Sequence, residues 1–67
     1  MELFTIIEVA GKLKTTKSVV YNLIKAKHIV ALKLGNMKVT SFELERFIKQ
    51  CQGKDYSDLE NVKELKI

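Results

Sequence analysis

The chain has 67 residues, of which 46% are hydrophobic and 30% are charged. This composition is typical of one small globular domain and excludes a disordered chain. The single cysteine excludes a disulfide framework, and one cysteine with one histidine is too little for a metal site. We therefore expect a protein without cofactor or metal, whose small core gives a net stability of about 3–5 kcal/mol.

The positive charges lie in one interval that contains no acid. The net charge is +4, and between Glu8 and Glu43 the sequence has lysines but no Asp or Glu. A folded segment of one sign favours a polyanionic partner over scattered solvated lysines, and nucleic acid is the common polyanion. An anionic membrane surface is the weaker alternative, because the apolar stretches of the sequence suit a core. No apolar run reaches the roughly 20 residues of a membrane span. We expect a soluble, cytoplasmic protein with no membrane partner.

Two short helices are predicted near the N-terminus. Thr5 and Glu8 have the spacing of a capping box, which predicts a helix over residues 6–13. Thr16 is a favourable N-cap and predicts a second helix over residues 17–27. A short turn between two such helices indicates a helix-turn-helix.

A β-hairpin is predicted next, because apolar runs at 29–34 and 37–39 flank the turn signal Gly35-Asn36. Lys33 alternates with leucines in the first run. We therefore expect the leucines to face the core and Lys33 to face solvent. A hairpin that follows two helices predicts the wing of a winged helix-turn-helix.

A second capping-box spacing, from Thr40 to Glu43, predicts a third helix over residues 41–51. Gly53 lies just past its end, where glycine is favoured. The order helix, helix, hairpin, helix predicts a mainly α-helical winged helix-turn-helix domain with a small β-hairpin over residues 1–53.

The tail, residues 54–67, contains a third capping-box spacing from Ser57 to Glu60. Apolar residues recur there at intervals of three, which predicts a short fourth helix that needs a surface to lie on. We expect this apolar stripe to make protein contacts. It consists of Leu59, Val62 and Leu65.

The second predicted helix has the features of a DNA-recognition helix. Its first turn has no acid, which leaves the positive helix N-terminus open to a phosphate. Its outer face carries groups that can bond base edges, and the hairpin lysines suit the DNA backbone. For Tyr21 the alternative is half-burial in the core, and for Asn22 and Lys25 it is plain solvent exposure. The predicted DNA-contacting residues are Thr15, Thr16, Lys17, Ser18, Tyr21, Asn22, Lys25, Lys33, Asn36 and Lys38.

Catalysis has little support in the sequence. One histidine with no matching partners does not make a Ser-His-Asp set, and the three glycines are too scattered for a phosphate-binding loop. A domain this small can hardly enclose a substrate. We expect a binding protein rather than an enzyme, with no small-molecule substrate.

Several short motifs follow one another along residues 3–49: FTIIEVAGKL, TKSVVYNLI, VALKLG followed by NMKV, and ELERFI. In this order and spacing they resemble the excisionase-type helix-turn-helix domains, the small winged relatives of MerR DNA-binding domains. The family usually has glycine where Lys27 stands. Lys27 must therefore adopt a left-handed conformation, or the helix must end differently.

This resemblance implies an architectural protein that binds repeated sites in double-stranded DNA and bends them. It implies a role in excising a phage or mobile element together with a tyrosine integrase. The integrase and neighbouring copies of the protein are then the implied partners, reached through the tail. A small transcriptional regulator of a phage, plasmid or integrative element is the first alternative. A protein-interaction module that uses its tail is the alternative from another class.

Overall fold

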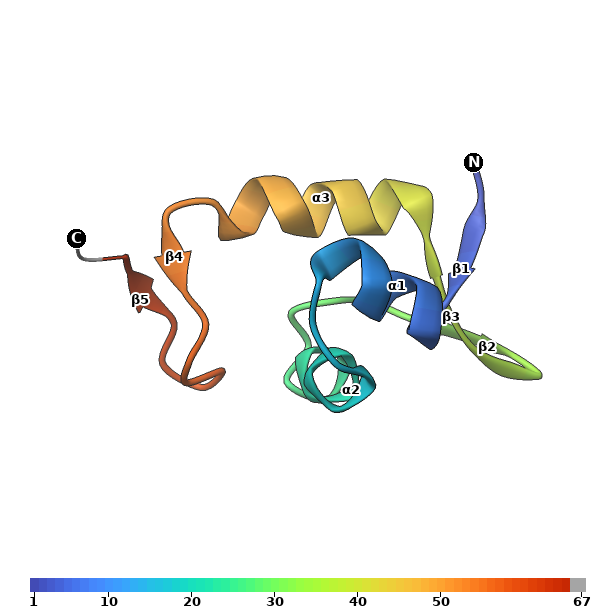
Figure 1. The fold of residues 1–67 in the computed structure, drawn as a ribbon, viewed down its shortest axis with the longest axis horizontal. Coiled ribbons are helices and arrows are strands. Elements are labelled where there is room, and N and C mark those ends of the chain that lie inside the picture. The colour runs from blue at the N-terminus through green and yellow to red at the C-terminus, as the bar shows by residue number, and fades with distance from the viewer. Residues whose placement is uncertain (66–67) are drawn as a thin grey trace.

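A computed structural model describes residues 1–65 of the chain. Within these residues the helices pack around a small core beside a three-stranded sheet, and a two-stranded hairpin lies at the C-terminal end (Figure 1). The winged helix-turn-helix predicted from the sequence is confirmed. The elements are β1 (Leu3–Thr5), α1 (Ile6–Leu13), α2 (Lys17–Lys25), β2 (Leu32–Leu34), β3 (Asn36–Thr40), α3 (Ser41–Cys51), β4 (Lys54–Asp55) and β5 (Lys63–Glu64).

α1 begins where the sequence predicts, because Thr5 and Glu8 form a complete capping box. The Glu8 amide donates to Thr5 Oγ1 at 3.2 Å, and the Thr5 amide donates to Glu8 Oε1 at 2.9 Å. Lys14 caps the other end in a left-handed conformation with φ of 56°. The Thr15 amide then donates to the Ala10 carbonyl oxygen at 2.9 Å, which turns the chain towards α2.

α2 begins at the predicted residue, because Thr16 Oγ1 accepts a hydrogen bond from the Val19 amide at 3.4 Å. Its last residue, Lys25, lies two positions before the predicted end. Lys27 then adopts a left-handed conformation with φ of 67°. Of the two alternatives for a chain without glycine at this position, a left-handed Lys27 or a different helix end, the structure has the left-handed Lys27.

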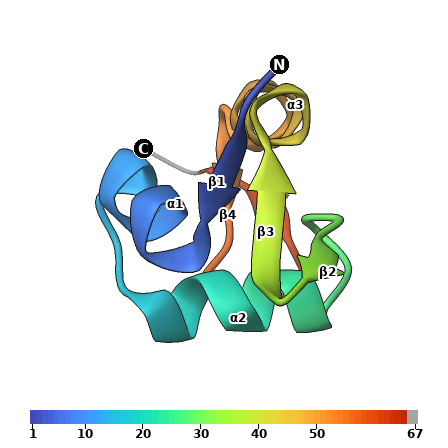
Figure 2. The same cartoon turned by 90° about the vertical axis from the view of Figure 1, so that its right-hand side faces the viewer.

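The sheet contains a strand that the sequence analysis missed. β1 and β2 both pair antiparallel with β3, so that β3 is the central strand (Figure 2). β1 has three residues, which is too few for a recognisable alternation. The hairpin turn is also tighter than predicted. Asn36 already pairs with Leu34, and Gly35 alone reverses the chain with φ of 75°.

The two leucines of β2 face solvent, so the prediction that they face the core is wrong. Val39 is fully buried, and alternation along β3 puts Met37 on the same, helix-facing side. Lys33 is the cross-strand partner of Met37 and shares its side. Leu32 and Leu34 therefore lie on the outer side, where they are 38% and 69% exposed. The register with β3, rather than the hydrophobicity of β2, decides which side each residue takes.

The core lies between the three helices and the inner side of the sheet. α1 and α2 contribute apolar residues three or four positions apart, as the inward face of a helix requires. The segment between α2 and β2 contributes Ile29, which is 1% exposed. The buried hydrophobic residues are Ile6, Val9, Ala10, Val20, Leu23, Ile29, Val39, Leu44 and Phe47.

The tail forms a β-hairpin, so the predicted fourth helix is wrong. The Asp55 carboxylate accepts a hydrogen bond from the Ser57 amide at 2.9 Å, and the Asp58 carboxylate accepts one from the Glu60 amide at 3.1 Å. Each bond spans two residues and closes a local turn. Such turns compete with the first turn of a helix.

The apolar tail residues therefore do not share a helix face. Leu59 is half-buried and packs against the core, Val62 is half-buried, and Leu65 is 52% exposed. Residues 66 and 67 of the predicted tail lie outside the described part of the chain. Across residues 1–65, no helix combines the length and the apolar character that crossing a membrane requires.

Candidate nucleic-acid interface

The side of α2 that points away from the core carries the predicted base-reading side chains. Val20 and Leu23 are buried, which fixes the rotation of the helix about its axis. At about 100° per residue, Ser18 and Lys25 lie opposite them. Tyr21 is 49% exposed and belongs to this outer face rather than to the core. The exposed residues of the face are Lys17, Ser18, Tyr21, Asn22 and Lys25.

The two threonines before α2 differ in how far they are committed to the fold. Thr16 is exposed, but its hydroxyl oxygen already caps the helix. Thr15 is half-buried in the turn. The first turns of α1 and α3 contain Glu8 and Glu43, whereas the first turn of α2 contains no acid. The helix dipole at this end therefore favours an anion, and no carboxylate of the first turn opposes it.

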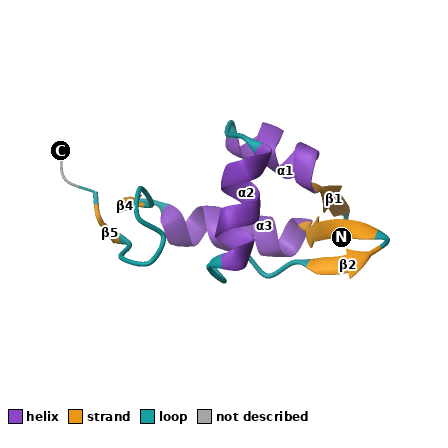
Figure 3. Ribbon diagram, turned by 90° about the horizontal axis from the view of Figure 1, so that it is seen from below, coloured by secondary structure: helices purple, strands orange, loops and turns teal. Residues whose placement is uncertain are grey.

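α2 and the β2–β3 hairpin meet at one surface hollow of about 450 Å³. Lys17 and Tyr21 line it from α2, and Lys33 and Asn36 line it from the hairpin. Figure 3 looks onto α2 and shows the hairpin beside it. The structure thus brings together residues that the sequence assigned to two separate elements. Lysines on two walls of one hollow give it the charge that a DNA phosphate requires.

Lys38 does not belong to this hollow. It pairs with Leu32 and Thr5 across the sheet, and it shares the outer side of the hairpin with Leu32. Hydrogen bonds with Thr5 lower the pKa of Glu8, and the charges of Lys12 and Lys38 lower it further. The two hairpin lysines therefore act on opposite sides of the sheet.

Three apolar residues that the sequence analysis did not assign also line the hollow, namely Ile6, Ile7 and Met37. Ile7 is 66% exposed, directly after the buried Ile6. The sequence carried a signal for Ile7, because it falls outside the inward stripe of its helix. It carried none for Met37, whose place depends on strand register. Apolar groups here can contact the methyl group of thymine.

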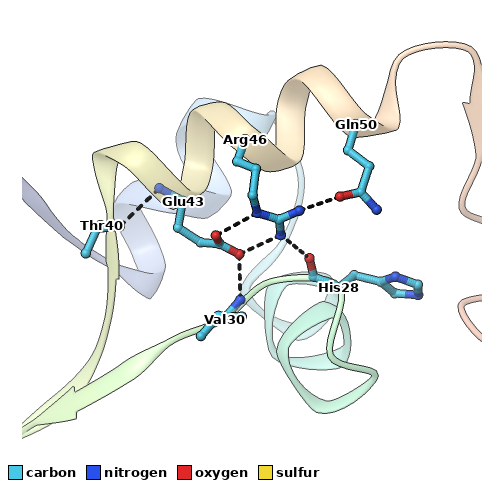
Figure 4. A network of polar contacts seen from close by, with 6 residues as sticks. All are labelled: His28, Val30, Thr40, Glu43, Arg46 and Gln50. Atoms are coloured by element: carbon cyan, nitrogen blue, oxygen red, sulfur yellow. Dashed lines mark hydrogen bonds and ion pairs between the residues drawn. The ribbon is translucent and has the colours of Figure 1, made fainter.

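A polar network joins α3 to the segment between α2 and β2 (Figure 4). Thr40 Oγ1 accepts a hydrogen bond from the Glu43 amide at 3.0 Å, as predicted for an N-cap. The Glu43 carboxylate does not complete the capping box, however, because it binds Arg46 instead. Arg46 Nε and Nη2 donate to its two oxygens at 2.8 and 2.7 Å.

Glu43 and Arg46 also bind the backbone of the segment between α2 and β2. Glu43 Oε2 accepts a hydrogen bond from the Val30 amide at 2.8 Å, and Arg46 Nη2 donates to the His28 carbonyl oxygen at 3.0 Å. Arg46 Nη1 also donates to the side chain of Gln50. The Arg46 hydrogen bonds lower the pKa of Glu43 most, and the Val30 amide lowers it further against the opposing effect of burial.

Two short helices joined by residues 14–16, the second exposed along a cationic face, define a helix-turn-helix protein. A family model described as "Helix-turn-helix domain" matches residues 3–52, and the chain belongs to this family. Comparisons with curated proteins and with solved structures gave no significant match. Membership of a helix-turn-helix family supports binding to double-stranded DNA, and such domains are typically not enzymes.

Proposed function

We propose that this protein binds specific sites in double-stranded DNA as an architectural factor, an excisionase that acts with a tyrosine integrase. The observation that carries the DNA-binding part is the hollow shared by α2 and the hairpin, with Lys17 on one wall and Lys33 on another. A duplex offers a major groove for α2 and, beside it, a phosphate backbone for the hairpin. A helix and a hairpin can reach both at once because they lie side by side (Figure 3).

The exposed residues of α2 have roles that follow from their chemistry. Asn22 can bond adenine through two atoms, Lys25 can donate to guanine, and the Ser18 hydroxyl can donate or accept. Tyr21, beside Lys17 in the hollow, reaches a phosphate or a thymine methyl group. In this proposal α2 supplies the sequence preference.

The turn and the hairpin supply contacts that do not depend on sequence. Lys33 binds a DNA phosphate from the hairpin side. Asn36 lies at the hairpin tip, where it comes next to the DNA backbone. Thr15 and Thr16 lie at the N-terminus of α2, where a phosphate approaches. Lys38 points to the outer side of the sheet and contributes only long-range attraction.

The excisionase part of the proposal rests on the motif resemblance over residues 3–49. In this reading residues 1–53 bind DNA, and residues 54–67 contact the integrase or a neighbouring copy of the protein. Leu59 packs inward, so these contacts fall to Val62 and Leu65. A small transcriptional regulator uses the same DNA-binding surface and is the second candidate.

Two experiments test the proposal. A duplex selected from a random library is titrated with the protein at two salt concentrations, beside a scrambled duplex. Preferential binding that weakens as salt rises supports DNA recognition, whereas absent or salt-independent binding contradicts it.

An excision assay with a cognate integrase and its attachment sites then tests the finer role. Repression of a promoter without any stimulation of excision favours the regulator.

A further inference from the structure

We propose that Glu43 and Arg46 position the β2–β3 hairpin against α2, and that they thereby set the affinity for DNA without touching it. Residues 26–31, called the connector below, join α2 to β2. The proposal rests on the proposed DNA-binding function, because a hairpin position matters to affinity only if the hairpin and α2 bind one duplex.

The connector has one buried anchor, Ile29, and the pair binds the backbone on both sides of it. The His28 carbonyl oxygen accepts from Arg46 Nη2, and the Val30 amide donates to Glu43 Oε2. His28 follows the end of α2, and Val30 precedes the start of β2. Two side chains of α3 therefore hold the exit from the recognition helix and the entry to the hairpin at once.

The geometry requires the planar guanidinium of an arginine. Arg46 spans both oxygens of Glu43 at 2.8 and 2.7 Å, and the same Nη2 reaches the His28 carbonyl oxygen at 3.0 Å. A lysine has a single ammonium group on a flexible stem and does not reproduce this fork. The Glu43 side chain is 12% exposed and the Arg46 side chain is 40% exposed, so salt reaches the pair from the Arg46 side and screens it in part.

The pair is remote from the proposed DNA surface. α3 and α2 lie on opposite sides of the core (Figure 1), so any effect on DNA binding must pass through the backbone. β2 begins two residues after Val30 and carries Lys33. It is an edge strand, which in the described part of the chain pairs only with β3. Releasing Val30 therefore allows β2 to shift and changes the separation of Lys33 from Lys17 across the hollow.

A double-mutant cycle on the full chain tests this coupling. Arg46→Lys keeps the charge and removes the fork, and we expect it to weaken binding to the selected duplex by roughly tenfold. Lys33→Ala should weaken binding by roughly tenfold in the wild-type background but by less than about twofold beside Arg46→Lys. Lys49→Ala, one turn further along α3, removes a charge that does not touch the connector and should change affinity by less than about twofold. Glu43→Gln is the second variant if Arg46→Lys does not fold.

Equal effects of Lys33→Ala in both backgrounds overturn the proposal and leave DNA binding intact. If the wild-type protein binds no duplex, the proposed function fails, and the hairpin position is measured without DNA. Nitroxide labels on Asn22→Cys and Leu34→Cys, in a Cys51→Ser chain, report the distance from α2 to the hairpin. A distance distribution that shifts or broadens with Arg46→Lys supports the positioning of the hairpin by Glu43 and Arg46. An unchanged distribution with a lower unfolding midpoint reduces the pair to a stabilising contact and overturns it.

Discussion

His28 Nε2 lies 2.6 Å from the carbonyl oxygen of Leu59, and this hydrogen bond joins the connector to the tail. Tyr56 packs between the two parts, edge-on to His28 with ring centroids 5.2 Å apart and edge-on to Phe47 with centroids 5.5 Å apart. Phe47 is a core residue of α3. The tail hairpin is therefore fastened to the body of the domain at both α3 and the connector.

Tyr56→Ala should lower the free energy of unfolding by about 1–3 kcal/mol, because it removes both ring contacts and uncovers Phe47. Urea unfolding followed by circular dichroism measures the change. Leu65→Ala is the matched control, since this exposed residue should change the free energy by less than about 0.5 kcal/mol. A Tyr56→Ala protein as stable as the wild type would contradict the packing of the tail.

Asn22→Ala and Lys25→Ala should each weaken binding to the selected duplex by about 1–3 kcal/mol. The proposed contacts are with base edges, so each substitution should also relax the preference at one position of the site. Fluorescence anisotropy with the selected duplex, its single-position variants and a scrambled duplex measures both effects. An equal loss of affinity for every duplex would mean that these side chains contact the DNA phosphate backbone instead of base edges.

Lys33→Ala should weaken binding to selected and scrambled duplexes alike and reduce the salt slope by about 1, as the loss of one phosphate contact requires. Lys38→Ala removes the same charge from the neighbouring strand, but on the outer side of the sheet. It should therefore leave the salt slope nearly unchanged. Equal salt slopes for the two variants would mean that both sides of the hairpin contact DNA phosphates.

The helix starts could be predicted because helix caps are local. Thr5, Thr16 and Thr40 each accept a hydrogen bond from an amide three residues further along the chain. Such a bond depends on sequence neighbours alone, and apolar spacing then orients the helix. β1 was not predictable in this way, since Leu3 forms a strand only by pairing with Thr40.

The face of α2 could be predicted for the same local reason, whereas the sides of the hairpin could not. Lys33 and Lys38 look alike in the sequence, and only the register of β2 with β3 puts them on opposite sides. The role of Glu43 was also misjudged from spacing. A guanidinium three residues along the helix is a stronger partner for a carboxylate than the amide of Thr40. Contacts that depend on a distant partner are the ones that the sequence left undetermined.

Acid should destabilise the protein partly through Glu43. The Arg46 hydrogen bonds hold the pKa of Glu43 below its ordinary value, so the ionised form stabilises the fold above the ordinary pKa of about 4.3. This contribution is lost as pH falls through the lowered pKa of the folded state. Urea unfolding at pH 6 and pH 3 should show a smaller acid loss for Glu43→Gln than for the wild type. Glu45→Gln, an exposed position on the same helix, should keep the wild-type acid loss.

Lys27→Gly should raise the free energy of unfolding by about 0.5–1 kcal/mol. Lys27 has φ of 67°, a conformation in which a side chain with a Cβ is strained and glycine is not. Glycine also loosens the unfolded chain, which offsets part of the gain. Lys25→Gly, at the last residue of α2, should instead lower the free energy of unfolding, by less than about 1 kcal/mol. Urea curves that show the same sign for both variants would mean that strain at residue 27 does not govern the end of the helix.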